Sequence, residues 1–132
     1  MNKLIGIISN IQTEGQLSLV SINVGSHLIN SIVLETPASA SYLIIGGEVK
    51  VLFKETEVII AKGAIENISL QNKLFGKIIN VESAALLSRI TIDIGIEKIA
   101  SIITTNAVKQ LNLNVNDEIV AMVKTNEITL AV

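Results

Sequence analysis

The sequence is organised around one stretch, Ser69-Leu70-Gln71-Asn72-Lys73-Leu74-Phe75-Gly76, because most of it occurs a second time near the start of the chain. The earlier copy is Asn2-Lys3-Leu4-Ile5-Gly6, so Gly76 corresponds to Gly6 at an offset of 70 residues. The same offset continues to the C-terminus without a gap. It aligns identical residues along the whole length, among them Asn10 with Asn80, Ser18 with Ser88, Gly25 with Gly95, Glu48 with Glu118 and Lys54 with Lys124. We therefore interpret the chain as a duplicated unit.

The length of the chain fits two small modules. The repeat divides the 132 residues into residues 1–63 and residues 69–132, joined by a short segment around Gly63 to Ser69. Units of this size bury only about 60% of their unfolded surface and are marginally stable alone. We therefore expect the units to pair or the chain to form oligomers.

The composition favours β structure. Nearly half of the residues are apolar (49%), but only 2% are aromatic, so Ile, Val and Leu must build the core. In the first unit, turn residues separate short apolar runs, which predicts a meander of three strands followed by two more. The predicted strands are Leu4–Ile11, Leu17–Val24, Leu28–Leu34, Val49–Lys54 and Val58–Ala61.

Each unit also contains a helix-start signal. Thr36-Pro37 combines an N-cap threonine with proline at the first helical position, which predicts a helix over Ala38–Ile44. Thr104-Thr105-Asn106 offers capping side chains before Ala107–Leu113 in the second unit. The sequence thus predicts an all-β protein of two tandem OB-like five-stranded β-barrels, each with one short helix.

Charge and residue types exclude several classes of function. A net charge of −2 and very few aromatic residues argue against nucleic-acid binding by the chain itself. The chain has no cysteine and only one histidine, so it lacks the residues that a zinc centre or a serine-type catalytic triad requires. The sequence contains no carboxylate pair, activated nucleophile or phosphate loop that would indicate an enzyme. No apolar run approaches the about 20 residues of a membrane span, and no secretion signal is present, so we expect a cytoplasmic protein.

Several short motifs, taken in order, resemble the Mop or TOBE module of molybdate-binding proteins. In the second unit they are Ser69–Gly76, Ile103-Thr104, Val123-Lys124 and Ile128–Val132, and in the first unit Asn2–Ser9 and Val58–Ala61. The resemblance covers essentially the whole chain, and the tandem copies resemble the di-Mop molbindins. It implies binding of molybdate or tungstate as an intact dianion in pockets between subunits, with no directly coordinated metal ion, and a homotrimer of di-Mop chains. Such a pocket needs backbone N–H groups, hydroxyls and a cation.

The motif at the first strand supplies four of the implied oxyanion-binding positions. The family's typical Ser-Ala-Arg-Asn falls on Ser69, Leu70, Gln71 and Asn72. Ser69 would donate its hydroxyl to the anion. Gln71 replaces the usual arginine, which removes a positive charge and a two-pronged donor, so we expect weaker affinity or a changed anion preference.

The remaining implied positions lie later in each unit. Thr104 matches a threonine ligand, and Ala107 stands where the family often has serine, a departure that deletes a hydroxyl. Lys124 matches the lysine that reaches the anion from the adjoining subunit. Lys54 occupies the equivalent place in the first unit, where no residues match Ser69 and Leu70, so two different kinds of site are expected.

Structural interpretations of the same residues stay open. Lys124 and Lys54 are also typical of solvated lysines at strand edges. Thr104 also fits the role of a helix cap, and it could serve as a cap only or as both a cap and an anion ligand. Gln71 also fits an ordinary surface position, and Asn72 also fits a role in packing the first strand.

The leading hypothesis is a stand-alone oxyanion-binding protein that stores or buffers molybdate or tungstate in the cytoplasm. The alternative is an oxyanion-sensing effector module that works with a transcriptional regulator or a molybdate transporter. The departures at Gln71 and Ala107 also leave open an oligomer that has lost binding. The sequence does not choose between molybdate and tungstate.

Overall fold

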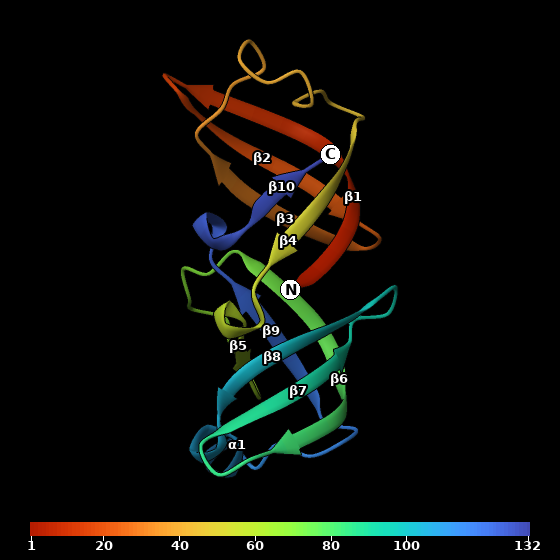
Figure 1. Cartoon of the computed structure of the whole chain (residues 1–132), viewed down its shortest axis with the longest axis vertical. Helices are drawn as coiled ribbons and strands as arrows, with labels where there is room; N and C mark the ends of the chain where they lie inside the picture. The colour runs from red at the N-terminus through yellow and green to blue at the C-terminus, as the bar shows by residue number, and fades with distance from the viewer.

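The structure is a computed structural model that describes residues 1–132. Its strands form two five-stranded, strongly curled sheets that follow one another along the long axis of the molecule (Figure 1). In chain order the elements are β1 (Asn2–Glu14), β2 (Leu17–Val24), β3 (His27–Val33), β4 (Glu48–Phe53), η1 (Glu55–Glu57), β5 (Ile59–Ala61), β6 (Asn72–Ser83), β7 (Leu87–Asp93), β8 (Lys98–Thr104), α1 (Thr105–Leu111), β9 (Glu118–Val123), η2 (Thr125–Glu127) and β10 (Thr129–Ala131).

The duplication seen in the sequence is present in the structure. β1 and β6 begin at Asn2 and Asn72, and η1 and η2 begin at Glu55 and Thr125, so equivalent elements keep the offset of 70 residues. Even the irregularities repeat, because the pairing register shifts between Ile8 and Asn10 in β1 and between Ile78 and Asn80 in β6. The two halves therefore share one local fold.

The last strand of each half belongs to the sheet of the other half. The first sheet has the order β10-β4-β1-β2-β3, and the second has the order β5-β9-β6-β7-β8. β10 pairs with β4 (Leu130 opposite Val51), and β5 pairs with β9 (Ile60 opposite Ala121). Figure 1 shows β10 crossing into the first sheet and β5 lying in the second. Residues 1–63 and 69–132 mark the sequence repeats, whereas each sheet is completed by a strand from the other repeat.

The predicted helix in the first unit is wrong. Residues 38–44 form a series of turns, with the Ala40 N–H donating to Thr36 O at 2.8 Å and the Leu43 N–H to Ala40 O at 3.2 Å. The Ser39 hydroxyl bonds both the backbone N–H and the carbonyl of Thr36, and such local bonds compete with helical ones. The chain therefore has one α-helix, the seven-residue α1, and no helix in it could span a bilayer.

One apolar core runs through both sheets. Strand β1 alternates buried and exposed residues from Asn2 to Ile8, and the fully buried isoleucines include Ile8, Ile22, Ile78 and Ile92. Burying one such side chain contributes about 1.5–3 kcal/mol. The core cluster contains residues of both sheets, so the two sheets pack as one molecule.

Two asparagines tie the sheets together at equivalent places. The Asn2 amide donates to Ala100 O and accepts from Ala100 N–H, both at 2.8 Å. The Asn72 amide donates to Asn30 O at 2.9 Å and accepts from Asn30 N–H at 2.7 Å. Each side chain thus mimics a strand partner for the backbone of the opposite sheet, and this fixes how β6 begins beside β3.

Candidate functional site

A pocket of about 600 Å³ lies at the junction of the two sheets. Its polar side is formed by the segment that leads into β6 and by the residues after β9. Its apolar side comes from β2, β3 and β5. The lining residues are Leu19, Ile32, Ile59, Ser69, Leu70, Gln71, Lys124 and Thr125. We refer to this cavity as the Lys124 pocket.

The strand register places the polar residues next to each other. Asn72, the first residue of β6, pairs with Val123, the last residue of β9. Gln71 and Lys124 are the next residues outward on these antiparallel strands, so they lie side by side. The backbone of Lys124 is extended (φ −66°, ψ 149°), and its carbonyl accepts from Glu127 N–H at 3.0 Å, which closes η2. Residues that are distant in the sequence are thereby brought to one place.

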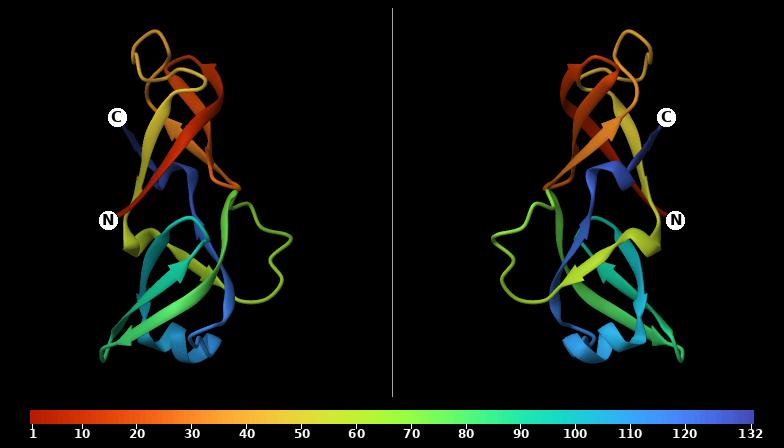
Figure 2. Two further views of the ribbon diagram at one scale, coloured as in Figure 1. Left: turned by 90° about the vertical axis from the view of Figure 1, so that its right-hand side faces the viewer. Right: turned by 90° about the vertical axis from the view of Figure 1, so that its left-hand side faces the viewer.

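The segment before β6 reaches the pocket from outside the sheets. The linker between β5 and β6 loops out from the side of the second sheet and returns at the junction (Figure 2). It is anchored at its start, where Lys62 Nζ donates to Asn112 O at 2.7 Å and to Asp117 Oδ2 at 2.9 Å. At its end, the buried Asn72 holds it against β3. Ser69, Leu70 and Gln71 therefore form one wall of the Lys124 pocket.

The donors of this pocket are not engaged elsewhere in the chain. The side chains of Ser69, Gln71, Lys124 and Thr125 form no hydrogen bond or ion pair within the molecule. Lys124 is the one charged residue among those that line the cavity, and no carboxylate opposes it. An ammonium, an amide and two hydroxyls beside apolar walls can receive a small anion.

Asn72 does not take part with its side chain. It is 1% exposed, and its amide oxygen and nitrogen both bond the backbone of Asn30. Its place at the edge of the pocket is structural, and it fixes the neighbouring Gln71. Leu70 contributes part of the apolar wall.

Thr104 and Ala107 lie away from the Lys124 pocket. Both belong to the N-terminal end of α1, at the far end of the second sheet (Figure 1). The Thr104 hydroxyl accepts a hydrogen bond from the Ala107 N–H at 3.1 Å, which is an N-cap interaction. Within one chain these residues do not join Ser69, Gln71 and Lys124.

Lys54 is equivalent to Lys124 but has different surroundings. It is exposed, and its carbonyl accepts from Glu57 N–H at 3.0 Å as in the other half. The residue after it is Glu55, where the second half has Thr125. Lys54 does not line the cavity that lies near Glu55.

That cavity, of about 360 Å³, is the counterpart of the Lys124 pocket in the other half. At the offset of 70 residues, Met1 corresponds to Gln71, Glu55 to Thr125 and Arg89 to Leu19. It is lined by Met1, Asn2, Lys3, Glu55, Arg89, Thr91, Glu97, Lys98, Ile99 and Ala100. We refer to it as the Glu55 pocket.

The carboxylate of Glu55 is held by donors on several sides. Its Oε2 lies 3.0 Å from the Met1 amino group and 3.7 Å from Arg89 Nη1. A hydrogen bond from the Glu55 backbone N–H, followed by the Met1 amino group, lowers the pKa of this carboxyl from its ordinary value of 4.5. Glu55 is therefore ionised at neutral pH.

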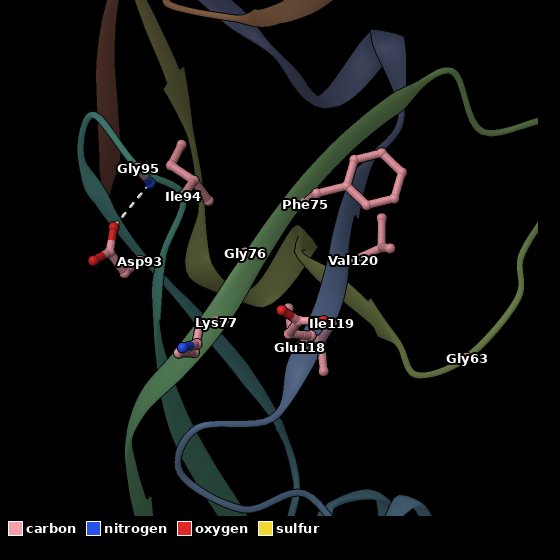
Figure 3. A pocket seen from close by; sticks show the side chains of 10 residues that line it. All are labelled: Gly63, Phe75, Gly76, Lys77, Asp93, Ile94, Gly95, Glu118, Ile119 and Val120. Carbon is pink, nitrogen blue, oxygen red and sulfur yellow. Dashed lines mark hydrogen bonds between the residues drawn. The ribbon is translucent and has the colours of Figure 1, made fainter.

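Another cavity has the wrong charge for an anion. It has a volume of about 750 Å³ and lies against β6 and β9 near Gly63. Figure 3 shows Lys77 and Asp93 on one side of β6 and Phe75 on the other. Asp93 and Glu118 oppose the single ammonium of Lys77, and Asp93 Oδ1 accepts from Gly95 N–H at 2.8 Å. We therefore place the candidate site in the Lys124 pocket.

The sequence did not indicate several residues that line the two pockets. Leu19, Ile32 and Ile59 enter the Lys124 pocket only because of how the sheets meet. The sequence does contain a signal for Thr125 and Glu55. Each comes directly after one of the two equivalent lysines, and the residue type differs between the halves. Comparing the repeats position by position for changes of charge finds them.

Comparisons with known proteins show what the chain is similar to. The model of the TOBE domain matches residues 68–130, which include the segment before β6 and the β9–η2 junction. A molybdenum-pterin-binding protein, MopB of Rhodobacter capsulatus, is 30% identical over 105 residues, which make up 78% of this chain and 39% of MopB. This chain thus spans about two fifths of the length of that relative.

A solved structure shares the fold over nearly the whole length. It is that of the cytoplasmic molybdate-binding protein ModG in a form with molybdate bound, with a TM-score of 0.90 and 24% identity. The match covers 99% of this chain and 95% of ModG. The complete arrangement of strands, including both halves, is therefore a known fold.

Proposed function

We propose that the chain, whose residues 68–130 match the TOBE domain, belongs to that family and binds molybdate or tungstate as an intact dianion in the Lys124 pocket. The observation that carries the proposal is the set of free donors around one lysine. Ser69, Gln71, Thr125 and Lys124 have no partner within the chain, and no carboxylate lines their pocket.

The chemistry of the pocket suits a tetrahedral dianion. An ammonium makes a charge-assisted hydrogen bond to an oxyanion, roughly twice as strong as a neutral one. Hydroxyl and amide groups can direct further protons to the remaining oxygens. The apolar side chains of Leu19, Ile32 and Ile59 lower the local dielectric, which strengthens these interactions.

A second chain would complete the site. Thr104 and Ala107, at the start of α1, lie too far from Lys124 in one chain to share an anion with it, so a neighbouring copy would have to supply them. Exposed apolar side chains support association, because Ile5 and Phe75 are 54% and 63% exposed on β1 and β6. We propose a homo-oligomer, a trimer of such chains, with the anion bound where the chains meet.

We further propose that the two halves act as tandem OB-like barrels, residues 1–63 and 69–132, that exchange their last strands. Each sheet is curled and five-stranded, and equivalent elements repeat. This arrangement supports two pockets of related origin in each chain, with the one helix confined to the second half.

The role that fits these features is storage or homeostasis of the oxyanion in the cytoplasm, without catalysis. MopB is named for binding rather than for a reaction, and ModG is described as a cytoplasmic binding protein. The Lys124 pocket offers donors and a cation but no base beside a nucleophile.

A sensing module of a regulator or transporter system is the second candidate. One observation favours it: MopB is much longer than the matched region, so this fold there forms part of a larger chain. Isolation of the protein from its host with a mild affinity tag separates the two roles. A stoichiometric regulator or transporter component among the captured proteins would favour sensing.

Isothermal titration calorimetry with molybdate tests the binding site directly. We expect the wild-type protein to bind molybdate and tungstate, and Lys124→Ala to weaken both by about 10- to 150-fold, because a lost hydrogen bond to a charged group costs about 1.5–3 kcal/mol. Lys50→Ala, an exposed lysine on β4, is the matched control and should leave the affinity unchanged. Binding that survives Lys124→Ala unaltered would refute the assignment.

A further inference from the structure

The two halves of the chain differ in charge where their pockets are equivalent. η1 and η2 begin at Glu55 and Thr125, each directly after a lysine with an extended backbone. Across from them stand Arg89 in the first case and Leu19 in the second. The two pockets therefore share the same backbone arrangement but differ in the charge of the side chains that line them.

In the Glu55 pocket the protein itself supplies an anion. The Met1 amino group donates to the Glu55 carboxylate at 3.0 Å, and the Arg89 guanidinium lies 3.7 Å from the same carboxylate. These are the kinds of donor that a free oxyanion would use. In the Lys124 pocket the corresponding Thr125 brings no negative charge, and the donors stay free.

We propose that Glu55 is a tethered anion that engages the donors of the second pocket, so that of the two pockets related by duplication only the Lys124 pocket takes a free molybdate or tungstate. This inference rests on the proposed function. A carboxylate attached to the chain competes at an effective concentration on the order of millimolar or above, so a free dianion must displace it before it can bind.

The remaining charges show that the pocket would otherwise attract an oxyanion. Lys3, Arg89, Lys98 and the Met1 amino group line the cavity together with two carboxylates, those of Glu55 and Glu97. Without the Glu55 carboxylate, four cationic groups face a single acid. Removing one side chain is thus expected to create a second site on an unchanged backbone.

The test is a titration of the full chain with sodium molybdate after Glu55→Thr, which copies the residue of the other half. We expect the wild type to show one class of site and Glu55→Thr to bind roughly twofold more molybdate per chain, because the competing carboxylate is gone. Glu57→Thr removes the same charge two residues away, from a side chain without an ion pair, and should keep the wild-type stoichiometry. Glu55→Gln gives the same readout with a side chain of the original size, in case the threonine variant does not fold.

The reverse change tests the same idea from the other pocket. Thr125→Glu should place a carboxylate beside Lys124 and abolish molybdate binding there, whereas Asn126→Glu, which adds the same charge to an exposed neighbour that does not line the cavity, should retain binding. Circular dichroism confirms that each variant is folded. Equal loss of binding in the two variants would contradict a role for a charge inside the cavity, and unchanged binding in Thr125→Glu would overturn the inference.

The outcomes separate this inference from the proposed function. If the wild type already shows two classes of site, or if neither Glu55 variant gains binding, the inference is overturned while the Lys124→Ala result decides the function separately. If the wild type binds nothing, the proposed function fails, and gained binding in Glu55→Thr alone would still support a pocket whose donors are engaged by its own carboxylate.

Discussion

At the level of single residues, identical lysines have different surroundings because the next residue along the chain differs. Lys54 and Lys124 are equivalent, exposed and similarly placed before a 3₁₀ turn. The neighbouring Glu55 or Thr125 decides whether a carboxylate or a free cavity lies nearby. Asn2 and Asn72, in contrast, keep the same role in both halves, because each bonds a backbone peptide of the opposite sheet.

Gln71→Arg should strengthen oxyanion binding. The change adds a positive charge and a two-pronged donor beside Lys124, and we expect affinity for molybdate to rise by about tenfold, which is about 1.4 kcal/mol. Asn67→Arg adds the same charge to an exposed position in the linker and is the control for a general electrostatic effect. Equal gains in the two variants, measured by calorimetry, would argue against direct contact at residue 71.

At the level of elements, apolar alternation predicted the strands well. The predicted strand Leu17–Val24 coincides with β2, and Val49–Lys54 differs from β4 by one residue at each end. The helix predicted over Ala38–Ile44 failed because Ser39 bonds the backbone of Thr36, while the start signal of the second half, which lies two residues earlier at the offset of 70, formed α1 with Thr104 as its cap. Capping signals alone did not distinguish these two outcomes.

The exchange of β5 and β10 was not predictable from pattern. Each strand has three residues, and pattern alone does not say which sheet they join, because the two halves offer equivalent partners in β4 and β9. The same exchange explains part of the site. It brings Ile59 to the Lys124 pocket of the second half, although Ile59 belongs to the first repeat.

Ile60→Ala tests the exchange by hydrogen exchange of backbone amides. Ile60 is 8% exposed and pairs with Ala121 of β9, so the truncation should destabilise the protein by about 2–4 kcal/mol and speed amide exchange around Ala121 more than in β4. Ile59→Ala, which shortens a side chain that is 46% exposed, should have little effect on either strand. Faster exchange confined to β4 would mean that β5 pairs within its own repeat.

At the level of the whole molecule, duplication gives two related pockets and sequence divergence makes them unequal. The sequence predicted Ser69, Leu70, Gln71 and Lys124 as site residues, and the structure gathers these four around one cavity. Thr104 and Ala107 lie at the far end of the second sheet and Lys54 lies outside the cavity near Glu55, so their roles stay predictions that depend on other copies of the chain.

The most direct test of anion binding in the Lys124 pocket is a crystal structure of the protein grown with tungstate, with the tungsten atoms located by their anomalous scattering. We predict a tungsten position in the Lys124 pocket, with a tungstate oxygen within hydrogen-bonding distance of Lys124 Nζ, and no tungsten in the Glu55 pocket. A tungsten position in the cavity of Asp93 and Glu118, or no bound tungstate at all, would contradict the account.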